Sequence, residues 1–414
     1  MLQPFCFEHE VAIAAIMKNE GHYVKEWLDY HTAAGVTKFY IYDNDSTDNL
    51  QEILQPYMNS GVVNFHRCPG KLAQLPAYMD AISRYRFECR YMAIIDGDEF
   101  IFPLQDKSIP ETVTELFAQH APMSALTLNW RLFGSSGHKE KNFQQGVLER
   151  FTHRGKDDFT DAKDDNIGGN FHIKSIVNPR FVNFFPNPHY AIYYDDILAK
   201  DEQGNVVLGP FNEHNPAEHI RVNHYFTKSL EEFKERRSLG CADNLGFRPD
   251  DEFYKKDLND IYDDGILTYW QSQKERSKNI DRRQIILKAT IDTLQSINTP
   301  NDDETGYTIE NILCHWYACQ TRYDKIFPPT VIDNFKEKLL QKIETIFNST
   351  QNIWQIRLLV DSLPMLMFDS PQTRTRIVTF IRNALPRVIG FYRRQNKWSE
   401  YKQMQQLLET VKIL

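Results

Sequence analysis

Apolar and polar positions in the first hundred residues follow two alternating patterns. Short apolar or β-rich runs alternate with longer segments in which apolar residues return every three or four positions. A short apolar run between polar residues indicates a buried strand, whereas the longer period indicates a helix with one buried face. The predicted strands are residues 11–17, 38–42, 62–65 and 91–95, and the predicted helices are residues 22–34, 50–58 and 74–85. Strands that alternate with helices predict an α/β fold with a Rossmann-like, mostly parallel sheet and helices on both faces.

The pattern changes twice after this region. Between about 124 and 226, strand-like runs at 125–130, 173–177 and 192–194 are separated by loops rich in Gly, Asn, Asp and Pro. From about 265 the chain consists of long helical runs punctuated by Pro. These runs are residues 282–297, 308–323, 332–347 and 353–367. The predicted organisation is an α/β domain over residues 1–264, followed by a mostly α-helical domain over residues 265–414.

Composition and charge narrow the class of protein without identifying it. The 414 residues have a formal net charge of −8, which gives no general reason to bind nucleic acid. The sequence starts without the pattern of a signal peptide, and no apolar run approaches the roughly 20 residues that cross a bilayer. The six cysteines form no Cys-x-x-Cys pair, so we expect reduced thiols. The sequence thus predicts a cytoplasmic protein that does not span a membrane.

Three polar loops follow the predicted strands at their carboxyl ends. Asn19 and Glu20 follow the first strand, residues 43–48 follow the second, and Asp96-Gly97-Asp98-Glu99 follows the fourth. The carboxyl ends of parallel strands share one edge of the sheet, so we expect the three loops to border one ligand pocket. Two carboxylates in an Asp-x-Asp pattern can approach a divalent cation that holds a diphosphate. The position of this common pattern predicts a metal-dependent site.

Each of these polar residues also has a purely structural interpretation. Asp43 and Asn44 favour turns and helix starts whether or not they contact a ribose hydroxyl or a uracil N–H. His224 ends a β-like run, and its neutral imidazole would suit Mn²⁺, yet the chain has thirteen histidines. Lys228 and Arg236 could neutralise a diphosphate or simply face solvent. Both interpretations stay open for each residue.

Several common catalytic motifs are missing from the sequence. It contains neither the phosphate-loop pattern G-x-x-x-x-G-K-[ST] nor a dinucleotide-binding G-x-G-x-x-G, so kinases and dinucleotide oxidoreductases lose support. The sequence also lacks a G-x-S-x-G elbow and an H-E-x-x-H helix, so it gives no support for a serine hydrolase or a zinc protease.

Four motifs occur in a fixed order in the first hundred residues. They are Met17-Lys-Asn-Glu20, Trp27-Leu-Asp-Tyr-His31, Tyr42-Asp-Asn-Asp-Ser-Thr-Asp48 and Ile95-Asp-Gly-Asp-Glu-Phe100. Together they resemble glycosyltransferase family 92 and its bacterial relatives in the family-2-like group. Further similar segments are Trp130-Arg-Leu-Phe-Gly-Ser-Ser-Gly137, Lys174-Ser-Ile-Val-Asn-Pro179, His189 and His224-Tyr-Phe-Thr-Lys-Ser229. The resemblance covers about residues 10–240 and leaves the helical tail without a counterpart.

This resemblance implies a GT-A fold and an inverting transfer from a UDP-sugar, with galactose as a first guess. The implied cofactor is Mn²⁺ or Mg²⁺. The residues that it places beside the nucleotide sugar are Asn19, Glu20, Asp43, Asn44, Gln74 and Asp96. The metal ligands that it implies are Asp96, Asp98 and His224. The residues that it places beside the acceptor or the sugar are Trp130, Gly134, Lys174 and His189.

An inverting transfer also needs a carboxylate base on the acceptor side. Glu149, Asp158 and Asp161 follow the Trp130 segment and are the base candidates, and the sequence does not choose among them. Glu99 is expected to be a structural residue of the acidic loop.

The predicted function is transfer of a sugar from a UDP-sugar to a glycan or lipid-linked glycan, in lipopolysaccharide or other cell-surface polysaccharide synthesis. One alternative is a non-catalytic carbohydrate-binding or scaffold protein that acts through the helical tail, and another is a nucleotidyltransferase. Basic and aromatic residues between 374 and 398 would allow peripheral contact with an anionic membrane at its inner face. A helix packed within its own domain, with a solvated basic edge, is the favoured explanation.

Overall fold

The protein divides into two compact units of different architecture. The structure, a computed structural model, describes residues 5–162, 168–194, 197–237, 251–276, 288, 291, 308–349, 352–363, 365 and 370–413. One unit contains His9–Ile280, and the other contains Met1–Glu8 with Asp281–Leu414. The division falls after Ile280 and not after residue 264, because the helix that begins at Gly265 packs on the first unit. The predicted helix 282–297 lies outside the described residues except at positions 288 and 291.

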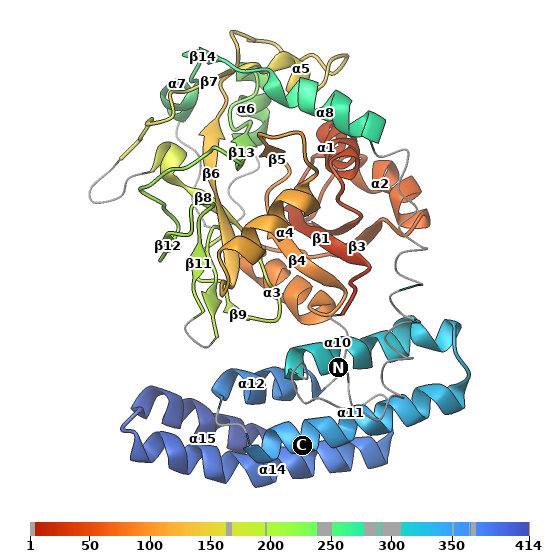
Figure 1. The fold of residues 1–414 in the computed structure, drawn as a ribbon. Helices are drawn as coiled ribbons and strands as arrows, with labels where there is room; N and C mark the ends of the chain where they lie inside the picture. Colours follow the sequence, from red (N-terminus) through yellow and green to blue (C-terminus); the bar gives the residue numbers. More distant parts are fainter. Residues whose placement is uncertain are drawn as a thin grey trace. The chain divides into compact units, whose positions relative to one another are not determined.

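A ten-stranded sheet forms the centre of the first unit (Figure 1). Its strands are β1 (His9–Met17), β2 (Lys38–Asp43), β3 (Val63–Arg67), β4 (Cys89–Ile94), β5 (Glu99–Pro103), β6 (Ala125–Leu132), β8 (Ile173–Val177), β11 (Ala199–Lys200), β12 (Val206–Val207) and β13 (Ile220–His224). Two small sheets pair β7 (His153–Arg154) with β14 (Ile261–Tyr262) and β9 (Val182–Phe184) with β10 (Ile192–Tyr193). The main order is β12-β11-β6-β8-β4-β1-β2-β3, and β13 pairs with both β5 and β6. The block β3-β2-β1-β4 is parallel, whereas β8 is antiparallel to β4 and β6.

Helices cover both faces of this sheet because its central strands are apolar on both sides. They are α1 (Gly21–Ala33), α2 (Leu50–Asn59), α3 (Gln74–Tyr85), α4 (Ile109–Gln119), α5 (Val147–Arg150), the 3₁₀ turn η1 (Gly169–Phe171), α6 (Leu230–Arg237), α7 (Glu252–Lys256) and α8 (Gly265–Arg276). In β1, Val11, Ile13 and Ala15 face a core shared with α1, α2 and α4. Ala12 and Ala14 face a second core shared with α3. This burial on both faces explains the uninterrupted apolar run in the sequence, and it confirms the predicted fold class of this unit.

Three aromatic side chains of α1 fix the position of β5. The Trp27 indole donates a hydrogen bond to the Glu99 carbonyl at 2.8 Å, and the Tyr30 hydroxyl donates to the Ile101 carbonyl at 2.8 Å. The His31 ring accepts from the Ile101 amide through Nε2 and lies 2.8 Å from the Trp27 carbonyl through Nδ1. A ring that accepts on Nε2 and donates from Nδ1 is a neutral imidazole. The first motifs along the chain therefore hold the strand that begins at the acidic loop.

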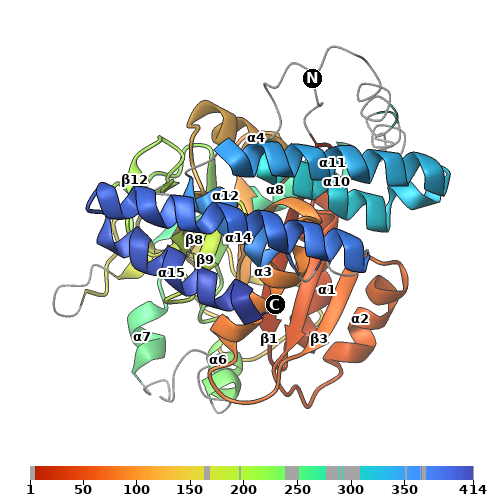
Figure 2. The same cartoon turned by 90° about the horizontal axis from the view of Figure 1, so that it is seen from below.

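The second unit is built from helices, as the sequence predicts. They are α10 (Ile309–Thr321), the 3₁₀ turn η3 (Tyr323–Lys325), α11 (Pro329–Ser349), α12 (Ile353–Asp361), α14 (Pro371–Arg394) and α15 (Trp398–Ile413). Figure 2 shows α14 lying along α11 and α15, and α14 contacts both of these helices. Thr308, Asn352 and Ser370 cap the amino ends of three helices with their side chains, which satisfies otherwise free N–H groups.

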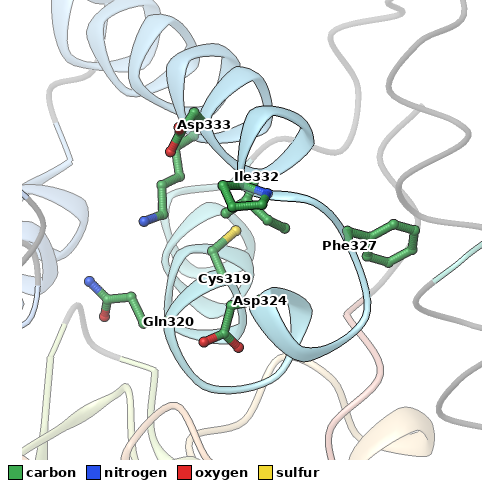
Figure 3. A pocket seen from close by; sticks show the side chains of 8 residues that line it. Cys319, Gln320, Asp324, Phe327, Ile332 and Asp333 are labelled. Atoms are coloured by element: carbon green, nitrogen blue, oxygen red, sulfur yellow. The ribbon is translucent and has the colours of Figure 1, made fainter.

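A depression of about 410 Å³ opens on the helical unit where α10, η3 and α11 meet (Figure 3). It is lined by Cys319, Gln320, Asp324, Phe327, Pro329, Ile332, Asp333 and Lys336. The Cys319 side chain is buried. The lining mixes two carboxylates, one ammonium group and apolar side chains.

The apolar side of α14 is covered by its neighbours in the helical unit. Ile377, Ile381, Leu385 and Val388 are buried, although Trp398 at the start of α15 is 55% exposed. The basic residues predicted in this region therefore lie on a helix whose main apolar stripe is already packed. Among the described helices, none is both long and apolar enough to cross a membrane.

The buried imidazole of His31 predicts a specific loss of stability in acid. Burial lowers its pKa from 6.5 to about 3. Below about pH 6.5 the unfolded chain binds a proton on His31, whereas the folded protein binds one only near pH 3. The stability that the neutral ring contributes is therefore complete above about pH 6.5 and is lost as the pH falls towards 3. We expect wild type to lose about 1.4 kcal/mol more unfolding free energy per pH unit in this window than His31→Gln, which does not titrate. Urea titrations of both proteins at about pH 7.5, 6 and 5 measure the difference, and parallel pH profiles would contradict it.

Candidate active site at the carboxyl end of the sheet

The turn that follows β4 is closed by its own acidic residues. The Asp96 amide donates to Glu99 Oε2 at 2.9 Å, and the Glu99 amide donates to the Asp96 carbonyl at 3.1 Å. Glu99 is fully buried and begins β5, whose position α1 fixes. Glu99 is therefore a structural residue of the turn, and Asp96 and Asp98 project from a rigid backbone.

Asp96 is held by three donors from two other elements. Its Oδ1 accepts from the Gln74 amide at 3.0 Å and from the Tyr78 hydroxyl at 3.1 Å, both on α3. Its Oδ2 accepts from Lys174 Nζ on β8 at 2.9 Å. The structure thus brings together the predicted residues Gln74, Asp96 and Lys174, and it engages both oxygens of Asp96 within the protein.

Lys174 is the buried counter-charge of the acidic turn. Its Nζ also lies 3.5 Å from Glu99 Oε2. Burial opposes the charged ammonium group, but Asp96 and Glu99 outweigh burial and raise the pKa of Lys174 above its usual value. Burial raises the pKa of Glu99 to about 8, although Lys174 acts in the opposite direction. One buried ammonium group therefore faces two carboxyl groups, that of Asp96, which is 28% exposed, and that of the fully buried Glu99.

Asp98 and His224 face each other because of the register of β13. His224 ends that strand opposite Glu99 of β5, and the Tyr225 amide donates to the Asp98 carbonyl at 2.9 Å. Asp98 Oδ2 is 3.4 Å from His224 Nε2 and also accepts a hydrogen bond from Arg236 on α6. Burial acts to raise the pKa of Asp98, but Arg236 and His224 outweigh it, and the pKa lies well below its usual range.

This pair of side chains fits a divalent cation. A carboxylate oxygen and a neutral imidazole nitrogen are ligands that Mn²⁺ accepts, and burial lowers the pKa of His224, which keeps the ring neutral. His224 Nδ1 and Glu99 Oε1, 3.9 Å apart, have no hydrogen-bond partner among the described residues. The same part of the chain contains no group of three His, Cys, Asp or Glu side chains that could hold a metal. A cation on Asp98 and His224 would take its other ligands from a diphosphate and water.

The loop after β1 is tied to the loop after β2. Asn19 has a φ of 56°, a left-handed conformation that is uncommon outside glycine. Its Oδ1 accepts from the Thr47 amide at 2.7 Å, and the Gly21 amide donates to Asp48 Oδ2 at 2.8 Å. The side chain of Asn19 thus holds two loops together at the predicted nucleotide edge.

The loop after β2 is also braced from within. Asp43 Oδ1 accepts from the Ser46 amide at 3.1 Å, and Asn44 Nδ2 donates to the carbonyls of Cys68 and Gly70 at 2.8 Å each. These contacts agree with the turn interpretation of Asp43 and Asn44 and leave the nucleotide interpretation open. Beside this loop lies a depression of about 940 Å³. Its lining residues are Asp43, Asp45, Ser46, Thr47, Asp48, Gln51, Glu52, Gln55, Arg67 and Pro69.

Glu20 and Lys228 form a second buried charge pair near Asp98. Lys228 Nζ lies 3.9 Å from Glu20 Oε2 and 4.1 Å from the centre of the Tyr23 ring. Lys228 has a φ of 50°, so its backbone is held in a left-handed conformation that costs energy. The Tyr23 hydroxyl donates to Glu232, which also pairs with Arg150 at 2.8 Å. These contacts fix the start of α6, from which Arg236 reaches Asp98.

Trp130 is the centre of a buried aromatic cluster on the other side of His224. Its ring centre is 4.4 Å from that of His224, 4.7 Å from His172 and 5.1 Å from His189. The Trp130 indole N–H is buried without a hydrogen-bond partner among the described residues. Two predicted sugar-facing residues, Trp130 and His189, are thus brought together, and an unused donor lies between the histidines.

Gly134 has a packing requirement of its own. A Cβ at this position would overlap the backbone of Leu258, and the Gly134 amide donates to the His153 carbonyl at 2.9 Å. The glycine therefore permits a close approach of two main chains, and its predicted place beside the acceptor stays a prediction.

The three base candidates occupy different surroundings. Glu149 is exposed on α5, whose amino end is bound by the Glu26 carboxylate at 2.6 Å from the Val147 amide. Asp158 is exposed as well. Asp161 is partly buried, accepts from the Gly169 amide and lies 3.3 Å from Lys256.

Three residues of the site were not predicted from the sequence. Tyr78 lies one helical turn after Gln74, a spacing that places both on one face of α3 and that could have identified it. His172 comes just before β8, two residues from Lys174. Lys256 reaches the site from α7, and no sequence pattern connects it to the acidic turn.

A mostly parallel sheet with a carboxylate cluster beyond its strand ends defines an α/β protein whose candidate ligand site lies at that edge. The family model named Glycosyltransferase family 92 matches residues 8–235, which is more than half of the chain. The chain belongs to this family. Its matched region includes the acidic turn, the aromatic cluster and most of α6, so the resemblance predicted from the motifs is confirmed.

Curated relatives carry the same family name. A family 92 protein of Oryza sativa subsp. japonica is 23% identical over 284 residues, which is 64% of this chain and 44% of that protein. A family 92 protein of Ricinus communis is 29% identical over 147 residues, which is 35% of this chain and 26% of that protein. The chain therefore spans less than half of the length of these two relatives.

The crystal structures of TarS from S. aureus are distant structural neighbours. The 1–349 fragment is 15% identical with a TM-score of 0.29, covering 80% of this chain and 91% of the fragment. The same fragment in complex with UDP is 12% identical with a TM-score of 0.30, covering 82% of this chain and 91% of the fragment.

The buried ammonium group of Lys174 lies beside Asp96 and Glu99, so its removal should cause a large loss of stability. Lys174→Met leaves Asp96 and Glu99 without their cation, and we expect the unfolding free energy to fall by about 3–5 kcal/mol. Lys25→Met is the matched control, because Lys25 pairs with Asp29 while its side chain is 67% exposed. That control should change stability by less than about 1 kcal/mol. Urea unfolding of the three proteins compares them, and equal losses in both variants would contradict the assigned role of Lys174.

Proposed function

We propose that this protein transfers a sugar from a UDP-sugar to a hydroxyl group of a glycan acceptor, with inversion at the anomeric carbon. Membership of glycosyltransferase family 92 supports the reaction class. The observation on which the proposal chiefly rests is the pair Asp98 and His224, whose facing atoms are 3.4 Å apart beyond the ends of the sheet. A cation held there would neutralise charge on a diphosphate leaving group.

Asp98 and His224 are the proposed metal ligands, with Mn²⁺ as the first ion to test and Mg²⁺ as the second. Asp96 has a different proposed task, because Gln74, Tyr78 and Lys174 already engage its oxygens. Its fixed carboxylate would accept a hydrogen bond from a ribose hydroxyl. This division of labour differs from a site in which both aspartates bind the metal directly.

Two cations of the 224–237 segment are proposed to stabilise the departing diphosphate. Arg236 pairs with Asp98, and Lys228 lies beside Glu20, so both are directed towards the carboxylate cluster. Each can exchange a carboxylate for a phosphate oxygen of the ligand, since guanidinium and ammonium groups bind both kinds of anion. Charge that appears on the leaving group then meets donors that are already in place, which is an effective form of electrostatic catalysis.

The nucleoside is proposed to lie at the edge formed by Asn19, Glu20, Asp43 and Asn44, and the sugar beside Trp130 and His189. The unpartnered indole N–H of Trp130 would donate to a sugar oxygen in this arrangement. UDP-galactose is the first donor to test. A cell-surface glycan, free or lipid-linked, is the proposed acceptor.

Asp98→Asn should remove Mn²⁺-dependent turnover. The substitution keeps the shape of the side chain and removes its charge, so the metal loses its carboxylate ligand. We expect Mn²⁺-stimulated release of UDP from a panel of UDP-sugars to fall by at least about 100-fold. In a thermal-shift assay, UDP with Mn²⁺ should also stabilise this variant less than wild type, because weaker binding to the folded state gives a smaller shift.

Asp106→Asn is the matched control, since the Asp106 side chain is 69% exposed and lies outside the acidic turn. It should keep the activity and the thermal shift of wild type. Full Mn²⁺-dependent activity in Asp98→Asn would overturn the metal assignment. Absence of UDP release by wild type from every UDP-sugar, with and without glycan acceptors, would favour the non-catalytic carbohydrate-binding alternative.

A further inference from the structure

Asp161 is held in a fixed position by the backbone and by one cation. Its Oδ1 accepts from the Gly169 amide, and its Oδ2 lies 3.3 Å from Lys256 Nζ. Gly168 and Gly169 have φ values of 60° and 55°, and a Cβ at Gly168 would overlap the Asp161 carboxylate. Only glycine fits this close approach at position 168, so the local backbone is shaped around the carboxylate.

The same turn connects Asp161 to the aromatic cluster. The Gly169 carbonyl is 3.1 Å from His172 Nδ1, and the His172 ring stacks on Trp130. Gly169 therefore contacts the carboxylate through its amide and the wall of the proposed sugar site through its carbonyl. Among the three base candidates, only Asp161 has contacts within the described part of the chain that lead to that wall.

The ring of Phe226 links the two charged ends of the site. Lys256 Nζ lies 4.6 Å from the ring centre, and the Arg236 guanidinium lies 5.7 Å from it. Lys256 pairs with Asp161, whereas Arg236 pairs with Asp98. Asp98 and Asp161 are thus connected through two cations that contact the same buried ring. An inverting transfer needs separate positions for the base and for the leaving group, because they act on opposite sides of the sugar.

We propose that Asp161 is the catalytic base of the transfer and that Lys256 is its positioning residue. This proposal rests on the proposed glycosyl transfer and adds the residue that activates the acceptor. The acceptor hydroxyl gives its proton to the Asp161 carboxylate, and its oxygen electron pair forms the new bond to the anomeric carbon. The bond from that carbon to the β-phosphate oxygen breaks, and its electron pair leaves with UDP. Protonated Asp161 returns the proton to solvent after product release.

The surroundings of Asp161 suit this step. Burial acts to raise its pKa, but Lys256 and the Gly169 amide outweigh burial, and the pKa lies below its ordinary value. The carboxylate is therefore ionised at neutral pH, which is the state that a base needs, although the lowered pKa makes it a weaker proton acceptor than an ordinary aspartate. Glu149 and Asp158 are exposed, and neither has a contact in the described residues that would orient it towards Trp130.

Asp161→Asn tests the base directly, because the amide keeps an oxygen for the Gly169 N–H and cannot accept the proton. With UDP-galactose or the best donor of the panel, we expect UDP release to fall by about 100-fold or more. The affinity for UDP with Mn²⁺, measured by calorimetry, should stay within about twofold of wild type, since only a transition-state interaction is lost. Asp106→Asn is the matched control, since the Asp106 side chain is 69% exposed and lies outside the site. Asp158→Asn tests the exposed alternative candidate.

Sodium azide separates loss of the base from other defects. Azide attacks the anomeric carbon without having to lose a proton, so it bypasses a missing base. It should restore UDP release in Asp161→Asn to within about tenfold of wild type and produce the inverted glycosyl azide. It should not restore Asp98→Asn, because the proposed metal ligand is still missing there.

Each result of these measurements bears on the proposal. Wild-type rates in Asp161→Asn, loss of UDP affinity together with the rate, or failure of azide to restore release would each overturn Asp161 as the base. Wild-type rates in Asp161→Asn, or failure of azide to restore release, would still leave the proposed glycosyl transfer standing. Absence of UDP release by wild type would instead overturn the proposed function, and the base assignment would fall with it.

Lys256 is tested by the pH profile of UDP release. The groups that face Asp161 are Lys256 from α7, His172 before β8 and the Gly169 amide. Lys256→Met removes the cation that lowers the pKa of Asp161, so activity should be lost on acidification at a higher pH than in wild type. Lys256→Arg should restore the wild-type profile. An unchanged acid limb in Lys256→Met would show that Lys256 does not act through Asp161.

Discussion

The buried ammonium group of Lys174 is the interaction on which the candidate site depends. It compensates Asp96 and Glu99, the residues that open and close the acidic turn, and burial of such carboxylates without a cation costs several kcal/mol. The folded turn therefore depends on β8, which carries Lys174. The antiparallel direction of β8 matters here, because it brings a lysine from later in the chain to the ends of the parallel strands. Asp98 can then remain ionised and directed towards His224 and Arg236.

Sheet register places the second half of the site. β13 lies between β5 and β6, with His224 opposite Glu99 on one side and beside Leu132 on the other. A shift of one residue would turn His224 to the opposite face of the sheet, so the register fixes the Asp98–His224 pair. Trp130 is on the neighbouring strand, which explains why its ring contacts His224. The Asp98–His224 pair and the contact between Trp130 and His224 thus both depend on the pairing of these three strands.

The sequence predicts the parts of this protein that depend on local pattern. The strands β1 to β4 have apolar runs long enough to identify, and the loops at their ends follow directly. The partners of Lys174 and the choice of Asp161 over Asp158 depend on contacts between distant segments, which no local pattern encodes. The place of helix α8 depends on distant contacts as well. Its helical pattern is ordinary, and its packing, for example of Tyr269 near Tyr30, is what joins it to the α/β unit.

The contact between Asp98 and Arg236 spans 138 positions of the chain. During synthesis from the amino terminus, the four parallel strands are complete long before β8, β13 and α6 exist. Contacts of such long sequence separation are also slow to form in folding, because a large loop must close first. The acidic turn therefore spends the early stage of folding hydrated and without its cations. The contacts of Asp98 with His224 and Arg236 form only when β13 and α6 dock, so a nascent chain would acquire them in a late step.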